Sequence, residues 1–228
     1  MNKADSSSAG AGRIAVFDVC DTLYRANTTR GFLRFFHEAR RGSSFARTEW
    51  AWTSRSSPLF YVGAVAYRWL GRDIARRMLL LTLRGARREE LRAVARDYAA
   101  TVLPAKRVEA LHEKLREHRE AGDRVVLISN SLDVVVEQIA ENLGVEWSAS
   151  RLAYAGDVCT GTLALDLTGR KAGELRRLDP ERSSTLFVYT DNRSDLDLLN
   201  EADFPTVILP FGRGRSAWKG QKFDFLEA

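Results

Sequence analysis

The sequence predicts an α/β protein with a doubly wound parallel sheet and an inserted α-helical cap. Short apolar runs that end at a polar residue alternate with helical patterns, as in sheets whose parallel strands are joined by helices. Residues 28–103 interrupt this alternation and contain no convincing strand pattern. The composition, 45% hydrophobic and 29% charged over 228 residues, is that of a globular protein long enough to bury a substantial core.

Apolar runs along the chain are the candidate strands. The first, Arg13–Phe17, ends at Asp18 and is continuous rather than alternating, as expected of a strand buried on both faces. Arg124–Ile128 ends at Ser129 in the same way. The further candidates are Thr185–Tyr189, Thr206–Leu209 and, more weakly, Trp147–Ser150.

Helical patterns fill the intervals between these runs. We expect helices at Ala105–Ala121, Leu132–Leu143, Lys171–Leu178 and Ser194–Glu201. The stretch Arg151–Leu165 alternates around Gly156 and Asp157, which suggests a β-hairpin. The tail Phe211–Ala228 contains three glycines and is expected to be irregular.

The domain organisation follows from this pattern. We expect a core domain from residues 13–27 and 104–228, with 28–103 as the helical cap between hinges near Thr28 and Pro104. Residues 1–12 are rich in Ser, Ala and Gly and have no apolar segment, which indicates a disordered leader rather than a signal peptide. Pro58–Leu70 is the most apolar stretch, but it is shorter than the roughly 20 residues that span a bilayer. A buried or interfacial helix fits it better.

Charge is distributed unevenly along the chain. Residues 25–100 contain 16 Arg, no Lys and six acidic residues, a net charge of +10, which leaves −5 on the rest of the molecule. Arginines close to tryptophan in this segment suit a phosphorylated or otherwise polyanionic substrate. They could equally be solvated, or lie against an acidic core or an anionic membrane surface. Membrane contact is possible but not expected, and the oligomeric state is not determined.

A nucleic-acid partner and a disulfide framework have little support in the sequence. The basic segment has no recognisable nucleic-acid reading motif, so we expect no nucleic-acid partner. Only two cysteines occur, which argues against a disulfide framework and favours a reducing, cytoplasmic location.

Four polar clusters stand at the ends of candidate strands or before a helix. They are Asp18 to Thr22, Ser129 with Asn130, Lys171, and Asp191 to Asp195. Ligands bind beyond the carboxyl ends of the strands in such sheets. The four clusters, in this order over about Arg13–Pro210, resemble the motifs of the haloacid dehalogenase-like superfamily. The closer similarity is to its helical-cap branch, which includes phosphoserine phosphatase-like enzymes.

The resemblance implies a Mg²⁺-dependent hydrolase of phosphomonoesters that acts on a small phosphorylated metabolite. A carboxylate that attacks phosphorus forms an aspartyl-phosphate, and a divalent cation offsets the like-charge repulsion. Asp18 would be the nucleophile, while Lys171 and Ser129 would stabilise the transferring phosphoryl group. The resemblance further gives Thr22 and Asn130 substrate contacts. Its metal ligands are Asp18, the backbone carbonyl of Cys20, Asp191 and Asp195, the last of these either as a ligand or behind one.

One position departs from the pattern of these phosphatases. The residue two places after the nucleophile is usually a second Asp that acts as general acid and base, and here it is Cys20. Asp21 would have to swing into the site to replace it, since a regular strand would turn it away. Loss of such a group costs about 10²–10⁴-fold in rate, and leaving groups of low pKa suffer least. Two alternatives therefore stay open: a dehalogenase-type enzyme, or a catalytically idle protein that binds anions or a partner.

Overall fold

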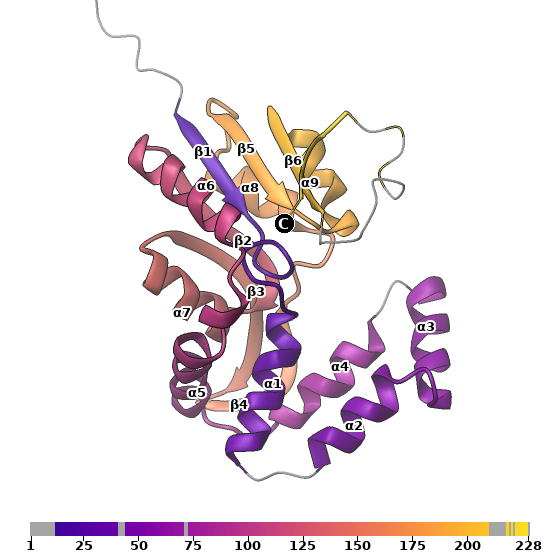
Figure 1. The fold of residues 1–228 in the computed structure, drawn as a ribbon. Coiled ribbons are helices and arrows are strands. Elements are labelled where there is room, and N and C mark those ends of the chain that lie inside the picture. The colour runs from indigo at the N-terminus through magenta and orange to yellow at the C-terminus, as the bar shows by residue number, and fades with distance from the viewer. Residues whose placement is uncertain are drawn as a thin grey trace, which may run out of the picture.

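The computed structural model describes residues 12–40, 44–70, 73–209, 218, 220 and 222–227. Apart from Gly12, the predicted leader lies outside these residues. The described strands form one seven-stranded sheet in the order β4-β3-β2-β1-β5-β6-β7 (Figure 1). The strands are β1 (Arg13–Phe17), β2 (Arg124–Leu132), β3 (Glu146–Ala155), β4 (Val158–Leu165), β5 (Thr185–Thr190), β6 (Phe204–Leu209) and β7 (Asp224–Glu227).

The strand pairing confirms the doubly wound parallel sheet. β1 lies between β2 and β5, and all strand pairs are parallel except β3 with β4. β3 and β4 form the suggested antiparallel hairpin, with the turn at Gly156 and Asp157. The prediction that the tail is irregular was wrong for β7, a four-residue strand that pairs with β6 at the sheet edge.

Alternation along β1 shows how both faces of the sheet are covered. Ala15 and Phe17 point into a core cluster shared with α6 (Glu109–Glu120) and α7 (Asp133–Leu143). Ile14 and Val16 point to the opposite face, where they join the cluster of α8 (Lys171–Leu178) and α9 (Leu196–Glu201). Successive residues of a strand face opposite sides, so a continuous apolar run is what two covered faces require.

Two helix boundaries differ from the prediction for local reasons. Residues 104–106 form the short 3-10 helix η2, and Val108 is extended, so α6 starts at Glu109 rather than at Ala105. Leu132 is the last residue of β2, so α7 starts at Asp133. The last predicted helix is divided into the 3-10 helix η3 (Arg193–Asp195) and α9.

The inserted segment is helical in its described residues. It contains α1 (Thr28–Ala39), α2 (Ser44–Thr53), α3 (Pro58–Leu70), α4 (Ile74–Leu80), the 3-10 helix η1 (Leu81–Leu83) and α5 (Arg88–Thr101). In Figure 1, α1 and α5 lie beside α7, while α2, α3 and α4 extend to one side of the sheet. None of the helices in the described part of the chain is long and apolar enough to cross a membrane.

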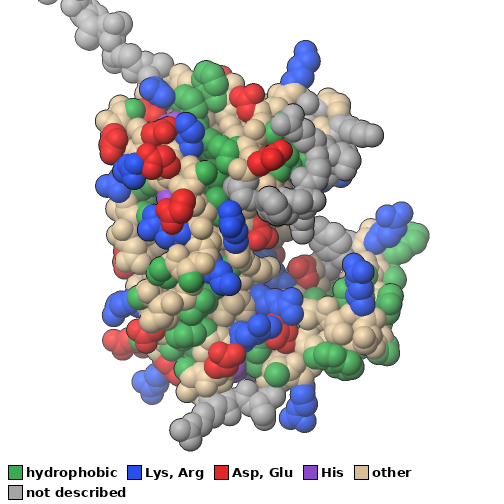
Figure 2. Space-filling view, viewed as in Figure 1, with side chains coloured by type: hydrophobic (Ala, Val, Ile, Leu, Met, Phe, Trp, Pro, Cys, Tyr) green, Lys and Arg blue, Asp and Glu red, His purple; other side chains and the backbone are tan. Residues whose placement is uncertain are grey.

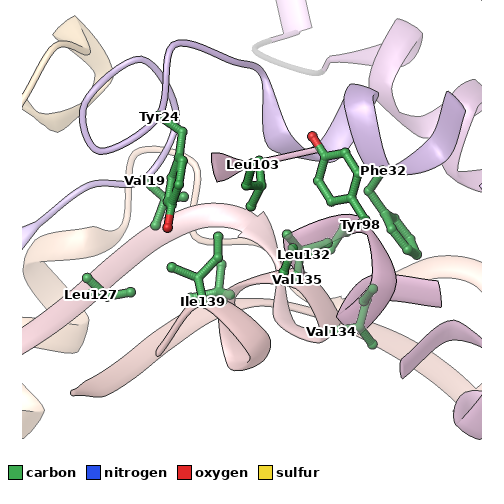
Figure 3. Close-up of a cluster of buried hydrophobic side chains, with 14 of the residues drawn as sticks. Val19, Tyr24, Phe32, Tyr98, Leu103, Leu127, Leu132, Val134, Val135 and Ile139 are labelled. Carbon is green, nitrogen blue, oxygen red and sulfur yellow. The ribbon is translucent and has the colours of Figure 1, made fainter. Parts of the chain in front are cut away.

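A single apolar cluster joins α1 and α5 to the sheet. Phe32 of α1 and Tyr98 of α5 are buried against each other and lie close to Val134 and Val135 of α7 (Figure 3). Leu127 of β2 belongs to the same cluster. Part of the inserted segment is therefore built into the main core.

The hairpin of β3 and β4 also packs against the inserted helical segment. Gly161 of β4 has φ +76°, and a Cβ at this position would lie 2.9 Å from the Leu81 Cα of η1. This backbone conformation and this close approach both require glycine. The sheet edge and the helical segment thus pack backbone against backbone here.

Candidate functional site

The carboxyl ends of β1, β2 and β5 meet at one edge of the sheet. Phe17 pairs with Leu127 and Tyr189 on its two sides, so the next residues of the three strands are level with one another. The Asp18 N–H donates to the Tyr189 carbonyl at 3.0 Å, which continues the ladder by one residue. Parallel register alone therefore brings Asp18 to the same edge as the ends of β2 and β5.

A buried charge cluster lies at this edge. The Lys171 Nζ is 2.9 Å from Asp18 Oδ2 and 2.6 Å from Asp195 Oδ2, and all three side chains are buried. Burial acts to lower the pKa of Lys171, but the charges of Asp18 and Asp195 outweigh it and hold the pKa above its ordinary value. Lys171 is thus a fixed cation beside two carboxylates.

Asp195 is fully engaged with the protein. Its Oδ2 accepts from Lys171 and from the Thr190 hydroxyl at 2.7 Å, and its Oδ1 accepts from the Ser194 hydroxyl at 3.2 Å. Its side chain has no exposed surface. Its position fits the second of the two places expected for it, behind the ligands, where it contacts and orients Lys171. Its part in metal binding stays a prediction.

Asp191 takes a more open position. It lines a cavity together with Asp21, while Thr22 donates to its Oδ1 at 3.3 Å and accepts from its N–H at 3.1 Å. Burial, followed by the charges of Asp18 and Asp21, raises the pKa of Asp191 to about 7. Three carboxylates thus repel one another near the cavity floor, and Lys171 offsets this only in part.

Thr22 lies against Asp191 at the sheet edge. It is fully buried, and it is not among the residues that line the cavity. The loop after β1 closes through a hydrogen bond from the Tyr24 N–H to the Val19 carbonyl at 3.1 Å, which turns Thr22 inward. Thr22 therefore contacts Asp191, and its predicted contact with substrate stays a prediction.

Asp21 turns out of the strand. Its φ of +50° lies in the left-handed region, which Asp tolerates better than most residues. The side chain is exposed at the cavity and is close enough to Asp191 for its charge to raise the pKa of that residue. The swing that a proton-transfer role would require is thus present.

The Cys20 thiol points toward the start of α1 and the end of β2. Its Sγ lies 3.1 Å from the Thr28 hydroxyl and 3.0 Å from the Ser131 hydroxyl, and it accepts from the Thr28 N–H at 3.3 Å. The two hydroxyls are 2.7 Å apart. Burial, and next the charge of Asp18, raise the pKa of the Cys20 thiol. The thiol therefore stays protonated and cannot act as a base.

The end of β2 carries the other predicted residues. Ser129 is buried, and its hydroxyl accepts from the Ser131 N–H at 3.2 Å. Asn130 lines the cavity, and its carbonyl accepts from Arg76 of α4 at 2.5 Å. Arg76 also donates to Asp166 at 2.9 Å and to Thr168 at 3.0 Å. Arg76 therefore ties α4 to the end of β2 and to the loop before α8.

The cavity has a volume of about 540 Å³ and lies between the sheet edge and the helical segment. Cys20, Asp21, Asn130 and Asp191 line it, whereas Asp18, Ser129, Lys171 and Asp195 are buried in the sheet edge beside them. From the helical segment, the charged lining residues are Arg30, Arg76 and Asp73 among the residues that the structure describes. The uncharged lining residues of this side include Asn27, Leu33, Trp52, Thr53, Phe60 and Leu79.

The donors present fit a magnesium ion. Carboxylates of Asp18 and Asp191 and a backbone carbonyl are hard oxygen ligands, which Mg²⁺ prefers, and it keeps several waters besides. Burial first, and then the charges of Asp18 and Asp21, raise the pKa of Asp191, and a bound cation would act against both causes. No cluster of three or more His, Cys, Asp or Glu side chains suited to a metal occurs in the described ranges, so side chains alone would not complete a coordination shell.

Several residues that contact the site were not predicted from the sequence. Thr28, Ser131, Thr190 and Arg76 each hold a predicted residue in place. Their patterns in the sequence are those of ordinary capping or surface residues. Only Thr190, which directly precedes Asp191 at the end of a predicted strand, had a signal that would have identified it.

Comparison with known proteins gives a consistent result. The family model of the haloacid dehalogenase-like hydrolases matches residues 15–200. A Streptomyces azureus protein described as an inhibition of morphological differentiation protein is 25% identical over 202 residues, which are 86% of this chain and 71% of that protein. A Bordetella pertussis Tohama I structure of unknown function has a TM-score of 0.69 and 18% identity and covers 95% of this chain and 98% of its own. A phosphoserine phosphatase structure with a phospho-aspartyl intermediate analogue has a TM-score of 0.55 and 16% identity, with 86% of each chain covered.

Proposed function

The chain belongs to the haloacid dehalogenase-like hydrolase family, and we propose that it is a Mg²⁺-dependent phosphomonoester hydrolase with Asp18 as its nucleophile. The observation that carries this proposal is the buried cluster of Asp18, Lys171 and Asp195 at the strand ends, beside a cavity lined by Asp191. The similarity to a phosphoserine phosphatase with a phospho-aspartyl analogue supports the same chemistry.

Asp18 is held for attack by its two neighbours. Its Oδ1 accepts from the Val19 N–H at 2.7 Å and its Oδ2 contacts Lys171, so the carboxylate is fixed before the substrate arrives. Pre-fixing a nucleophile removes orientational entropy from the reaction barrier. Lys171 would also stabilise charge on the phosphoryl oxygens, since it stays protonated in the buried cluster.

The proposed reaction has two steps. An Asp18 oxygen forms a bond to phosphorus while the bond to the ester oxygen breaks, and the leaving oxygen takes a proton from Asp21. Water then attacks phosphorus, with its proton going to Asp21, and the Asp18 carboxylate and inorganic phosphate are released. The exposed position of Asp21 at the cavity supports this proton-transfer role, whereas the raised pKa of Cys20 counts against the thiol.

The magnesium ion would be held by Asp18, Asp191 and the Cys20 carbonyl, with Asp195 orienting Lys171. When bound, it neutralises charge between nucleophile and phosphate. Thr22 holds Asp191 through two hydrogen bonds, since its hydroxyl donates to the carboxylate and accepts from the Asp191 backbone N–H.

The cavity supports a small phosphorylated metabolite as the substrate. A volume of about 540 Å³ lies within the usual range of small-molecule sites. Without an Asp at position 20, substrates with leaving groups of low pKa, such as acyl or anomeric phosphates, are the better candidates. The two cysteines are both unpaired, which is consistent with a reducing, cytoplasmic location.

Phosphatase assays with acetyl phosphate and p-nitrophenyl phosphate test the nucleophile. We expect Asp18→Asn to lose activity by about 10³-fold or more, because the amide cannot form the acyl phosphate bond. Asp157→Asn, in the distant hairpin turn, is the matched control and should retain activity. Unchanged activity in Asp18→Asn would end this proposal and favour an idle anion-binding protein.

Metal dependence separates the phosphatase from a dehalogenase. Mg²⁺ should raise the melting temperature of the wild type by mass action, and Asp191→Asn should weaken that shift without abolishing folding. Phosphatase activity that persists after chelation would contradict the Mg²⁺ dependence, whereas halide release from a 2-haloacid without added metal would favour the dehalogenase alternative.

A further inference from the structure

Exposed apolar side chains gather on one part of the molecule. Ten large hydrophobic residues are exposed among those described, and six of them fall between Trp50 and Trp69. Single exposed apolar residues are common on soluble proteins, but a contiguous group indicates a site of interaction.

Five of these six residues are on α3. Leu59, Val62 and Trp69 recur at helical spacing on one side, and Tyr61 and Val65 lie next to them. Trp69 is 80% exposed and Tyr61 is 58% exposed. We call these five residues the outer face of α3.

The inner side of α3 is already used. Phe60, Gly63 and Ala64 line the cavity. A Cβ added at Gly63 would lie 3.8 Å from the Trp52 ring of α2. The helix thus packs inward on α2 and α4 and leaves an apolar side outward, although burial of that side would be the usual way to stabilise such a helix.

The charges on α3 itself and on the turn before it are all positive. From Trp50 to Leu70 the chain contains two arginines, Arg55 and Arg68, and no acidic residue. Both arginines are exposed. Figure 2 shows apolar and basic side chains together on the side of the molecule where Figure 1 labels α3. An anionic partner surface fits this combination.

We propose that the outer face of α3 docks on an anionic lipid bilayer. The face is a convex ridge of one helix, which penetrates a fluid surface more readily than it fills a preformed protein groove. Trp and Tyr favour the boundary between lipid headgroups and acyl chains. Exposed Arg55 and Arg68 add attraction to anionic headgroups, and the length of α3 permits surface insertion but not spanning.

This docking goes beyond the proposed hydrolysis and does not depend on it. The inner side of α3 borders the cavity, so docking would bring the cavity close to the lipid surface. Contact with a membrane was not expected from the sequence, because the exposure of α3 became apparent only from its packing.

Vesicle flotation with the full chain tests the proposal. We expect the wild type to float with phosphatidylcholine vesicles that contain phosphatidylglycerol and to float much less with phosphatidylcholine alone. The variant Val62→Gln/Val65→Gln/Trp69→Gln should lose at least about tenfold in partition coefficient, since three inserted side chains are removed. Gln keeps good helix propensity, and circular dichroism checks that the variant folds.

Two comparisons isolate the cause. Trp147→Gln makes the same chemical change at an exposed tryptophan of β3 and should bind as the wild type does. Arg55→Gln/Arg68→Gln should lose the preference for anionic vesicles. The proposal is overturned if the wild type floats with neither vesicle, or if the triple variant floats equally well. It is also overturned if the wild type is a dimer without vesicle binding and the triple variant is a monomer, because the face would then join two copies.

Discussion

Lys171 is the most constrained side chain of the site. Lysine is rarely buried unless it is paired, and here it has no exposed surface and contacts two carboxylates. Such a cluster contributes little net stability by itself, because the desolvation of three charges offsets their attraction. It does fix the geometry, since loss of Lys171 leaves two buried carboxylates without a cation, and loss of either carboxylate leaves Lys171 with one anionic contact.

A stability prediction follows for Lys171→Met. Asp18 and Asp195 would be left buried with no cation, so we expect a loss of about 3–5 kcal/mol in the free energy of unfolding. Urea denaturation of metal-free protein measures it. Lys114→Met removes an exposed lysine whose ion pair with Glu117 is solvated, and it should cost less than about 1 kcal/mol. Equal effects in the two variants would mean that Lys171 is not a structural counter-charge.

The neighbours Cys20 and Asp21 should differ in their effect on turnover. We expect Asp21→Asn to lower kcat by about 10²-fold or more for substrates with poor leaving groups, and less for acetyl phosphate. Cys20→Ala should have a minor effect, because its thiol faces Thr28 and Ser131. Steady-state kinetics on both substrate types gives the comparison. Small, equal effects would show that Asp21 transfers no proton.

The sequence was informative where chemistry and strand ends coincide. Asp18 and Asp191 could be assigned to one sheet edge because each follows an apolar run, and their convergence needs only parallel pairing. Thr28 and Ser131 could not be linked in this way, because their contact with Cys20 depends on how a helix start meets a strand end far along the chain. The inward turn of Thr22 depended on loop closure, which has no signature in the sequence.

Among the elements, α4 is joined to the core by its buried Leu79 and Leu80, which belong to the main apolar cluster, and by the hydrogen bonds of Arg76. Its three acceptors belong to the end of β2 and to the loop before α8, and the side chain is largely buried. One guanidinium therefore couples the helical segment to the loop that positions Lys171.

Removal of this contact should loosen a defined region. In Arg76→Gln we expect faster amide hydrogen exchange in α4 and in residues 166–170, with unchanged exchange in α7, because the fork geometry is lost. Hydrogen exchange followed by mass spectrometry resolves these segments. Arg77→Gln, at the adjacent exposed position, is the control. If the two variants exchange alike, Arg76 does not restrain the region.

The hairpin makes a second contact between elements, at Gly161. Gly161→Ala combines a left-handed φ with a Cβ that meets the Leu81 backbone, so we expect a loss of roughly 2–4 kcal/mol in unfolding free energy. Gly156→Ala shares the positive φ but has open space around it and should lose only about 1 kcal/mol. Chemical denaturation of both variants tests the difference, and identical losses would exclude the close approach as the cause.

Element prediction failed mainly at the periphery. The central strands β1, β2 and β5 were found because each is a largely buried apolar run, whereas β7 is short and only half-buried at the edge. The exposure of the outward side of α3 could not be inferred from the sequence, because an apolar helix has the same sequence pattern whether it is buried or exposed. Most basic side chains of the segment are also used within the molecule, as in the ion pairs of Arg34 with Glu49 and Arg40 with Glu90.

In the whole molecule, the packing of the helices does not follow the expected boundary between core and cap. Residues 28–103 are one insertion in the sequence, yet α1 and α5 share the apolar cluster of β2 and α7. α3, in contrast, leaves much of its apolar surface exposed. Packing thus divides the insertion differently from its sequence boundaries, with α1 and α5 on the side of the sheet and α3 apart from it.

Cooperative unfolding should follow the packing. We expect amides of α1 and α5 to exchange with the same opening free energy as those of β1 and β2, because all four lose one shared core when they open. Amides of α3 should open at a lower free energy, since little buried apolar surface holds them. Native-state hydrogen exchange over a series of denaturant concentrations measures these free energies and the surface exposed in each opening. If α1 and α5 open together with α3 below the global transition, residues 28–103 form an independent cap, and the shared core contributes little to the stability of these two helices.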